Sequence, residues 1–238
     1  MRWYRKIGVI IALGLIIAVV IVITVKNKEC SEVTAANPKE TKQIVEIIPE
    51  QYEFDFEELA ASVVKLEVFN ENGDRIGTGS GFAAYDESIL ITARHVIVNM
   101  DYMTATRDDG TTFRIDRTIE TDDKSDIAIC ALPEDAKLVP LKFAEELPNR
   151  GTDTSVISSQ FGISNLVTKG NICGYWETNE STWIVFTAPV SGGSSGGPLF
   201  NEDGQVVGIV SGTYEKGQNL NIAATSKAAI DLCKSLFE

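Results

Sequence analysis

The sequence predicts an all-β domain with one membrane-spanning helix before it and a second helix after its last strand. Three observations support this prediction. Short apolar segments alternate with turn residues between residues 62 and 224, a pattern typical of a β-barrel or β-sandwich. An uncharged apolar run lies close to the N-terminus, whereas the segment 226–237 repeats apolar residues at helical spacing.

The membrane helix is predicted within residues 1–28. As a helix, the apolar run Ile7–Val25 would span about 28 Å, close to the thickness of a bilayer core. Cleavable signal peptides have a shorter apolar region of about 7–15 residues, and no small-residue cleavage site follows this run. A buried core helix is disfavoured because the run has no polar face. We therefore expect an uncleaved signal-anchor, with the N-terminus in the cytoplasm because basic residues and the free amine precede the run.

The rest of the chain is predicted to form a polar stalk over residues 29–55 and one globular domain over residues 56–238. Residues 29–238 contain 16 basic and 34 acidic side chains. Such an acidic domain is a poor candidate for binding nucleic acids or anionic lipid surfaces. Together with the anchor, this organisation predicts a membrane protein whose domain is extracytoplasmic, either extracellular or periplasmic.

The strand candidates follow one another at short, regular intervals, without an internal repeat. A short helix is expected over 54–61, and the turn residues Asn72-Gly73-Asp74 and Asp108-Asp109-Gly110 separate neighbouring strands. The predicted strands are 62–69, 75–85, 88–92, 102–107, 111–119, 126–132, 154–158, 166–175, 182–187, 205–211 and 219–224, with Leu199-Phe200 as a further strand-like pair.

The four cysteines, Cys30, Cys130, Cys173 and Cys233, lie far apart and form neither a CxxC motif nor a cluster with histidine. A metal site is therefore not expected, and no cofactor is indicated. Outside the cytoplasm disulfides are possible, and the sequence does not choose among the three pairings. Because Cys130 and Cys173 stand in apolar strand-like segments, we interpret both as buried thiols.

One loop, Gly192–Leu199, carries the strongest chemical signal. Its glycines allow backbone conformations with positive φ and a close approach to a ligand. Successive amides in such a turn can form a concavity that binds an anion. A serine in this position suggests a nucleophile whose oxyanion hole belongs to the same loop. The alternative is a simple glycine-serine turn between two strands.

A serine nucleophile needs a base, and His95 is the only histidine in the chain. The imidazole in turn needs an acceptor to orient its second nitrogen. Asp126, at the start of a predicted strand, is the best candidate. Asp101 and Asp116 remain alternatives, whereas Asp122 and Asp123 are more typical of solvated loop acids.

Three blocks resemble the signature blocks of trypsin-like serine proteases: TARHV around the histidine, SDIAI around the aspartate and GSSGGPL around the serine. SVVKLEV, GTGSGF and NIAATSKAAIDL are most similar to the HtrA/DegP-type branch. The resemblance covers about residues 56–238. It implies two packed six-stranded antiparallel β-barrels with the site between them, and hydrolysis of protein or peptide substrates through an acyl-enzyme.

The resemblance also implies roles for individual residues. Ser195 would be the nucleophile, with Ser194 at the variable position before it. His95 would act as general base and then general acid, and Asp126 would hold its tautomer. The backbone amides of Gly193 and Ser195 would form the oxyanion hole.

The resemblance also implies which residues bind the substrate. Ser211 resembles the serine that hydrogen-bonds the triad acid, and Ser211-Gly212-Thr213 would pair with the substrate backbone. Pro189 occupies the position that lies at the floor of the primary pocket in this family. No acid occurs between residues 187 and 200, so a basic side chain would be buried unpaired. We expect a preference for small or medium apolar residues before the cleaved bond.

Two departures from the family pattern leave questions open. Relatives in this branch usually carry a PDZ domain, and this chain ends at Glu238, so regulation through such a domain is not expected. The segment Ser191-Gly192-Gly193 is unusually glycine-rich, which leaves open whether the oxyanion hole is preformed or ordered by substrate. The alternative function is a catalytically inactive, protease-like module that binds peptides or acts as a scaffold. A processing enzyme for one membrane-proximal partner would differ only in its substrate.

Overall fold

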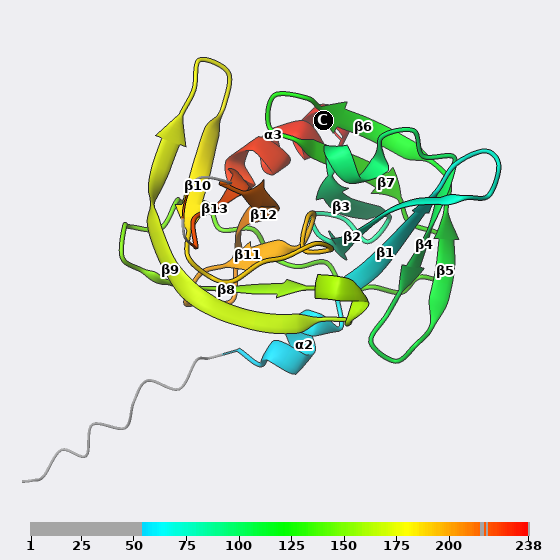
Figure 1. Cartoon of the computed structure of the whole chain (residues 1–238), viewed down its shortest axis with the longest axis horizontal. Coiled ribbons are helices and arrows are strands. Elements are labelled where there is room, and N and C mark those ends of the chain that lie inside the picture. Colours follow the sequence, from blue (N-terminus) through cyan, green and yellow to red (C-terminus); the bar gives the residue numbers. More distant parts are fainter. Residues whose placement is uncertain (1–53, 215–216, 218, 238) are drawn as a thin grey trace, which may run out of the picture. The chain divides into compact units, whose positions relative to one another are not determined.

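The computed structural model describes residues 54–214, 217 and 219–237. The predicted membrane helix within residues 1–28, and the predicted stalk up to residue 53, lie outside these residues. Within the described residues, no helix combines the length and apolar character needed to cross a bilayer. The described chain forms two antiparallel β-units and ends in a helix (Figure 1).

The first unit is a seven-stranded sheet with the order β5-β4-β1-β2-β3-β7-β6. Its strands are β1 (Val63–Phe69), β2 (Arg75–Ala83), β3 (Ile89–Ala93), β4 (Tyr102–Thr106), β5 (Thr112–Ile115), β6 (Thr118–Asp122) and β7 (Ile127–Ala131).

The second unit is a closed barrel of six strands, in the order β10-β13-β12-β11-β8-β9. This barrel confirms the predicted six-stranded unit in the second half of the domain. Its strands are β8 (Asp153–Ser158), β9 (Leu166–Glu177), β10 (Thr182–Phe186), β11 (Pro198–Phe200), β12 (Val206–Thr213) and β13 (Asn221–Thr225).

The first unit differs from the expected closed, six-stranded barrel. The single strand predicted over 111–119 is broken at Asp116-Arg117 into β5 and β6, which occupy opposite edges of the sheet. Because only two residues connect them, and a residue spans at most about 3.6 Å, the two edges come close at this bend. The unit is therefore a curled sheet that is not hydrogen-bonded into a closed barrel.

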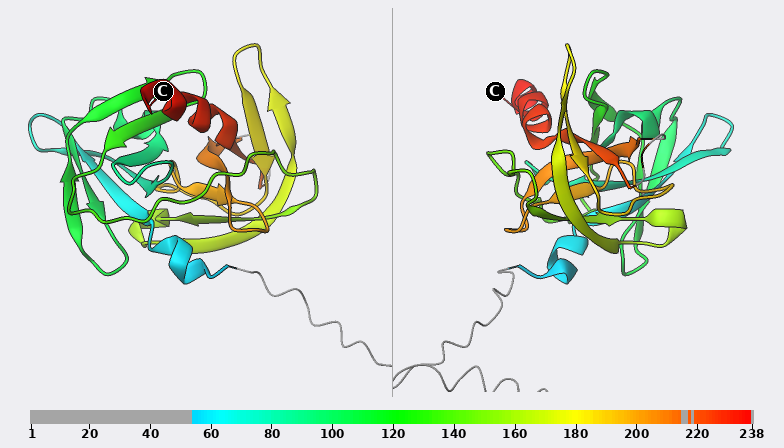
Figure 2. Two further views of the ribbon diagram at one scale, coloured as in Figure 1. Left: turned by 180° about the vertical axis from the view of Figure 1, so that it is seen from behind. Right: turned by 60° about the vertical axis from the view of Figure 1, so that its left-hand side comes forward.

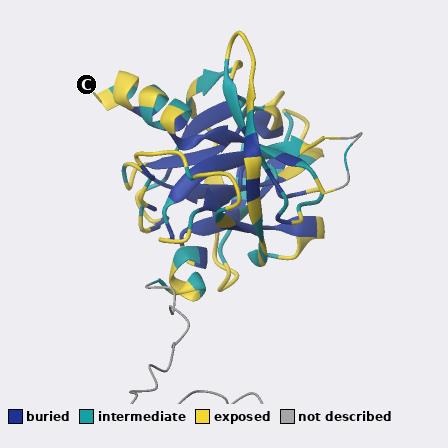
Figure 3. Ribbon diagram, turned by 90° about the vertical axis from the view of Figure 1, so that its left-hand side faces the viewer, coloured by how far each residue is buried: buried dark blue, intermediate teal, exposed yellow. Residues whose placement is uncertain are grey.

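The two units pack through a shared apolar layer. Strand β3 is buried on both faces: Leu90 belongs to the core of the first unit, whereas Ile89 and Ile91 face the second unit. On the other side of the layer, Ile157 and Phe200 of the barrel contribute to the same cluster. Figure 3 shows buried strands running through the middle of the domain. Hydrophobic burial of this layer stabilises the arrangement of the two units.

The helices predicted over 54–61 and 226–237 are confirmed. α2 (Phe56–Ala60) begins at Asp55, whose carboxylate accepts a hydrogen bond from the Glu57 amide at 3.0 Å. α3 (Ser226–Phe237) lies on the outside of the barrel (Figure 2) and buries Ala229 and Cys233 in the layer between the units. α3 thus packs with its apolar face inward, as its helical spacing predicts.

The cysteines correct one interpretation. Cys130 is buried as predicted, but Cys173 is exposed, because β9 alternates and places Ile172 in the barrel core. Burial raises the pKa of both the Cys130 and the Cys233 thiols to about 11. Cys130, Cys173 and Cys233 are all free, while Cys30 lies outside the described residues.

Candidate active site

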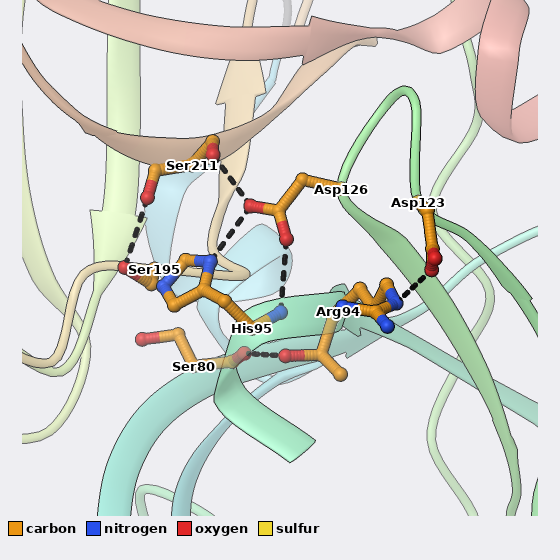
Figure 4. Close-up of polar contacts among 8 residues, drawn as sticks. Ser80, Arg94, His95, Asp123, Asp126, Ser195 and Ser211 are labelled. Carbon is orange, nitrogen blue, oxygen red and sulfur yellow. Dashed lines mark hydrogen bonds and ion pairs between the residues drawn. The ribbon is translucent and has the colours of Figure 1, made fainter. Parts of the chain in front are cut away.

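The predicted catalytic side chains come from three separate segments of the chain, and the fold brings them together (Figure 4). His95 lies in the short 3-10 helix η1 (Arg94–Ile97) that follows β3. Asp126 directly precedes β7, and Ser195 lies in the glycine-rich loop between β10 and β11. The histidine and the aspartate therefore belong to the first unit, and the serine belongs to the second.

The register of β3 against β7 places the histidine beside the aspartate. Ala93 pairs with Ile127, and beyond this pair the Arg94 amide donates to the Asp126 carbonyl at 3.0 Å. Asp126 has a φ of 55°, a left-handed conformation that aspartate adopts more readily than most residues. Two hydrogen bonds then join Asp126 to His95, one to its amide and one to its ring.

The carboxylate of Asp126 accepts three hydrogen bonds. The His95 amide donates to Oδ1 at 2.9 Å, His95 Nδ1 lies 2.7 Å from Oδ2, and Ser211 Oγ donates to Oδ2 at 2.5 Å. Burial raises the pKa of this carboxyl, but the hydrogen bonds from His95 and Ser211 outweigh burial, so the pKa lies below its usual value. The group is ionised at neutral pH and orients the ring with Nε2 free to accept a proton.

The other aspartates considered from the sequence make contacts elsewhere. Asp122 accepts a hydrogen bond from the Lys124 amide at 2.9 Å, Asp123 pairs with the Arg94 guanidinium, and Asp101 and Asp116 lie 3.9 and 3.7 Å from the Arg114 guanidinium.

The two neighbouring serines differ in their surroundings. Ser194 is 1% exposed, and its hydroxyl accepts hydrogen bonds from the Ser191 amide at 3.0 Å and from Ser158 Oγ at 3.2 Å. Ser195 is half-buried, and its Oγ donates to the Ser211 carbonyl at 3.2 Å. To give its proton to the imidazole, the hydroxyl must turn away from this carbonyl. Catalytic hydrogen bonds often align only when substrate binds.

The loop before Ser195 presents two free amides. Neither the Gly193 amide nor the Ser195 amide donates a hydrogen bond to another described residue. The Gly192 carbonyl accepts from the Phe161 amide at 2.8 Å, and because the peptide is planar and trans, the Gly193 N–H points the opposite way. Gly193 has a φ of 98°, and a Cβ there would lie 2.3 Å from the Ser159 carbonyl oxygen. The positive φ and the close carbonyl oxygen both require glycine at this position.

Ser80, which the sequence reasoning missed, fixes the same loop from the first unit. Its Oγ donates to the Gly193 carbonyl and accepts from the Ser159 amide, both at 2.8 Å. Its amide donates to the Ser195 carbonyl at 2.8 Å, and its carbonyl accepts from Thr92 Oγ1 at 2.7 Å. The sequence signal that could have identified Ser80 is a polar residue between two glycines, in a strand whose neighbouring strands are apolar.

The predicted substrate-binding strand lies beside the serine. On one side, Gly212 pairs with Ile222 and Thr213 with Asn221 of β13. On the other side, β11 pairs with β12 only as far as Ile209. Beyond β11, Val210 still bonds to the nucleophile loop: its carbonyl accepts from the Gly196 amide at 2.7 Å and its amide donates to the Gly197 carbonyl at 2.9 Å. The edge of β12 beyond Val210 has no strand partner among the described residues, so a peptide can extend the sheet there.

Pro189, the predicted pocket residue, is exposed, and its carbonyl accepts a hydrogen bond from Gln160 Nε2 at 3.2 Å. The preceding carbonyl, of Ala188, accepts from the buried Asn221 Nδ2 at 2.8 Å. These bonds hold the segment next to the β12–β13 pair.

Comparisons with known proteins identify sequences related to this chain. Residues 79–209 match the family described as "Trypsin-like peptidase domain". The chain is 29% identical over 207 residues to the anti-sigma-I factor RsgI9 of Acetivibrio thermocellus, covering 87% of this chain and 29% of that protein. It is 32% identical over 179 residues to the serine protease HTRA1 of Xenopus laevis, covering 67% of this chain and 39% of that protein. The chain thus spans less than half the length of these relatives.

The structure of the HtrA-type protease AlgW with a tripeptide is similar in fold. The TM-score is 0.68 at 21% sequence identity, and the match covers 78% of this chain and 64% of AlgW.

We predict that Ser80→Ala lowers kcat by roughly tenfold or more, with a smaller change in KM. Removing one oxyanion donor typically costs about 10²–10³ in kcat, and this substitution only loosens the peptides that carry the donors. The exposed Thr78 of the same strand provides the control, Thr78→Ala. Equal kcat values for Ser80→Ala and wild type would contradict a positioning role.

We also predict a pH-dependent effect of Ser211→Ala. The pKa of Asp126 is lower in the folded protein than in the unfolded chain, where it is about 3.9. The ionised carboxylate therefore stabilises the fold at higher pH, and this stabilisation is lost as the pH falls through the folded pKa. Removing the Ser211 hydroxyl raises the folded pKa, so the loss of stability relative to wild type is largest at pH 7 and shrinks below about pH 4. Urea unfolding from pH 7 to pH 3 measures this, and the Asp126→Asn background should remove the pH dependence. A constant difference across this range would refute the assignment.

Proposed function

The chain belongs to the trypsin-like peptidase family, in its HtrA/DegP-type branch, and we propose that it hydrolyses peptide bonds with Ser195 as the nucleophile. The observation that carries this proposal is the set of hydrogen bonds linking Ser211, Asp126 and His95 beside the Ser195 hydroxyl. A hydroxyl, an oriented imidazole and two free amides that meet at one place suit acyl transfer.

In the proposed mechanism, Nε2 of His95 takes the proton from Ser195 Oγ as the oxygen attacks the substrate carbonyl. The amides of Gly193 and Ser195 stabilise the resulting oxyanion. The imidazolium, stabilised by the ionised Asp126, then protonates the leaving amine, and the C–N bond breaks. Water attacks the acyl-enzyme with His95 again acting as base, which releases the acid product and restores the Ser195 hydroxyl.

We further propose that the residue before the cleaved bond is small or medium-sized and apolar. Its pocket would be bounded by Pro189 and by the face of the sheet that carries Thr213 and the buried Asn221. The segment 187–200 provides no carboxylate to pair with a basic side chain. An unpaired buried charge is costly, so a basic residue is disfavoured.

The proposed location is extracytoplasmic, on a membrane that the segment 1–28 spans. The apolar run in this segment, its basic flanks and the acidic composition of the remaining chain support this location. The protease domain would then act on protein or peptide substrates near the membrane surface.

The alternative is an inactive, peptide-binding module on the same fold. The hydrogen bond of the Ser195 hydroxyl to the Ser211 carbonyl, rather than to the imidazole, favours this alternative. The free edge of β12 would bind peptides in either case.

Labelling with a fluorophosphonate probe separates the two functions. Wild type is expected to be labelled and Ser195→Ala to be unlabelled, because only an activated hydroxyl attacks the phosphorus. Ser194→Ala is the matched control and should still be labelled, since the Ser194 hydroxyl faces the interior. An unlabelled wild type would favour the inactive module.

The same experiment tests the location when cells or spheroplasts receive a membrane-impermeant probe. Labelling by this probe is expected, with the labelled chain recovered in the membrane fraction. Labelling only by a permeant probe would contradict the extracytoplasmic location while leaving the hydrolase intact.

For specificity, we predict that peptides with Val or Ala before the cleaved bond are cleaved at least about tenfold faster, in kcat/KM, than a peptide with Arg. The Arg side chain would leave its charge unpaired in the pocket. The measurement uses three otherwise identical peptides, and dominant cleavage after Arg would overturn the pocket assignment.

A further inference from the structure

A short loop, residues 123–125, connects β6 to the candidate triad acid and takes no part in the proposed mechanism. Strand β6 ends at Asp122, and Asp126 directly precedes β7. Asp126 has a φ of 55°, a left-handed conformation that persists only where surrounding contacts hold it. The contacts of this loop therefore decide where the Asp126 carboxylate lies.

The second unit holds the loop on one side. Ser125 is 5% exposed, and its hydroxyl lies 3.0 Å from the hydroxyl of Ser181, in the turn between β9 and β10. That turn is closed by Thr178, whose Oγ1 accepts from the Ser181 amide at 2.9 Å. One end of the loop is thus fixed against the barrel, directly before Asp126.

Arg94 holds the same loop from the side of the histidine. It precedes His95 in η1, and its amide donates to the Asp126 carbonyl at 3.0 Å. Its guanidinium pairs with the Asp123 carboxylate. Figure 4 shows this side chain extending away from Ser195 and toward Asp123. One residue therefore joins the loop to η1 at two points.

The second point of attachment matters because the geometry between His95 and Asp126 tolerates little movement. The His95 amide donates to one carboxylate oxygen at 2.9 Å, and His95 Nδ1 lies 2.7 Å from the other. A single hydrogen bond, from the Arg94 amide, would let the loop rotate about it. Rotation would bend at least one bond to the carboxylate, and bent hydrogen bonds weaken steeply. The ion pair with Asp123 opposes this rotation.

The ion pair is open to solvent, since 37% of the Arg94 side chain and 72% of the Asp123 side chain are exposed. Exposed ion pairs contribute little to the free energy of unfolding. Loss of this pair should therefore leave the domain folded. Its effect is expected at the triad, where small displacements change the rate.

We propose that Arg94 is a positioning residue for the triad, which acts through Asp123 to keep the loop before Asp126 aligned with the helix that carries His95. This inference rests on the proposed peptidase function. Arg94 would not contact the substrate. It would affect catalysis only by fixing the carboxylate relative to the imidazole.

The first test compares the kinetics of Arg94→Ala and Asp123→Ala in the full-length chain, with a peptide that has Val before the cleaved bond. Each variant is expected to lower kcat about threefold to fivefold with KM nearly unchanged, because the pair is exposed and the backbone bond from residue 94 remains. Arg75→Ala removes an exposed ion pair between β2 and β1, with Glu67, and should keep the wild-type kcat. Wild-type kcat in both Arg94→Ala and Asp123→Ala would overturn the proposal.

The same two variants separate positioning from a direct effect of charge. Arg94→Ala removes a positive charge and Asp123→Ala removes a negative one, so a purely electrostatic influence on the imidazole would change kcat in opposite directions. Positioning requires a loss in both. The double variant should lose no more than either single variant, because each already breaks the same contact. Opposite effects, or losses that multiply in the double variant, would contradict the assignment.

Nuclear magnetic resonance follows the imidazole without turnover. His95 is the only histidine in the chain, so an untagged sample with isotopically labelled histidine gives ring signals from this residue alone. The proton on Nδ1 lies in the 2.7 Å contact with Asp126. Its signal is expected to move upfield and to exchange faster with water in Arg94→Ala and Asp123→Ala, whereas Arg75→Ala should match wild type. An unchanged signal in both variants would refute the positioning role.

Fluorophosphonate labelling distinguishes this failure from a failure of the proposed function. A labelled wild type whose kcat responds to neither variant contradicts only the role of Arg94. An unlabelled wild type contradicts the peptidase function, and the ring signals of His95 then still decide whether Arg94 holds the imidazole and the carboxylate together.

Discussion

The candidate site depends on the hydrogen bonds to the Asp126 carboxylate, because this one group holds the imidazole and also joins the first β-unit to the second. His95 donates from the first unit and Ser211 donates from the second. Apolar packing between the units is strong but non-directional, so it tolerates small displacements. A charge-assisted hydrogen bond is directional and does not, and it therefore positions the imidazole relative to the strand that would bind substrate.

A second polar junction complements the first. Ser80 reaches from β2 into the nucleophile loop and bonds to Gly193 and Ser195. The histidine side of the site and the serine side are thus connected at two places, one through a side-chain carboxylate and one through a side-chain hydroxyl. Glycines at 193 and 196 permit this close approach, since a Cβ at either position would lie 2.2–2.3 Å from a neighbouring oxygen.

In the proposed function, the same strand would serve both chemistry and recognition. Ser211 bonds to the carboxylate, Gly212 shares one face of the sheet with Ile222, and Thr213 shares the opposite face with the buried Asn221. This division follows from the alternation of side chains along β12. One short segment can therefore orient the catalytic groups and present two separate surfaces to a substrate.

The sequence alone determined the β-class, most strand positions and both described helices, because these depend on local periodicity, turn residues and helix caps. It also limited the candidate base to the single histidine. Only the tertiary structure decided which aspartate meets that histidine, that 111–119 breaks into two edge strands, that Cys173 faces outward, and that Ser80 holds the nucleophile loop. These outcomes depend on distances between residues far apart in the chain and on the face that each side chain takes, and local sequence patterns contain neither.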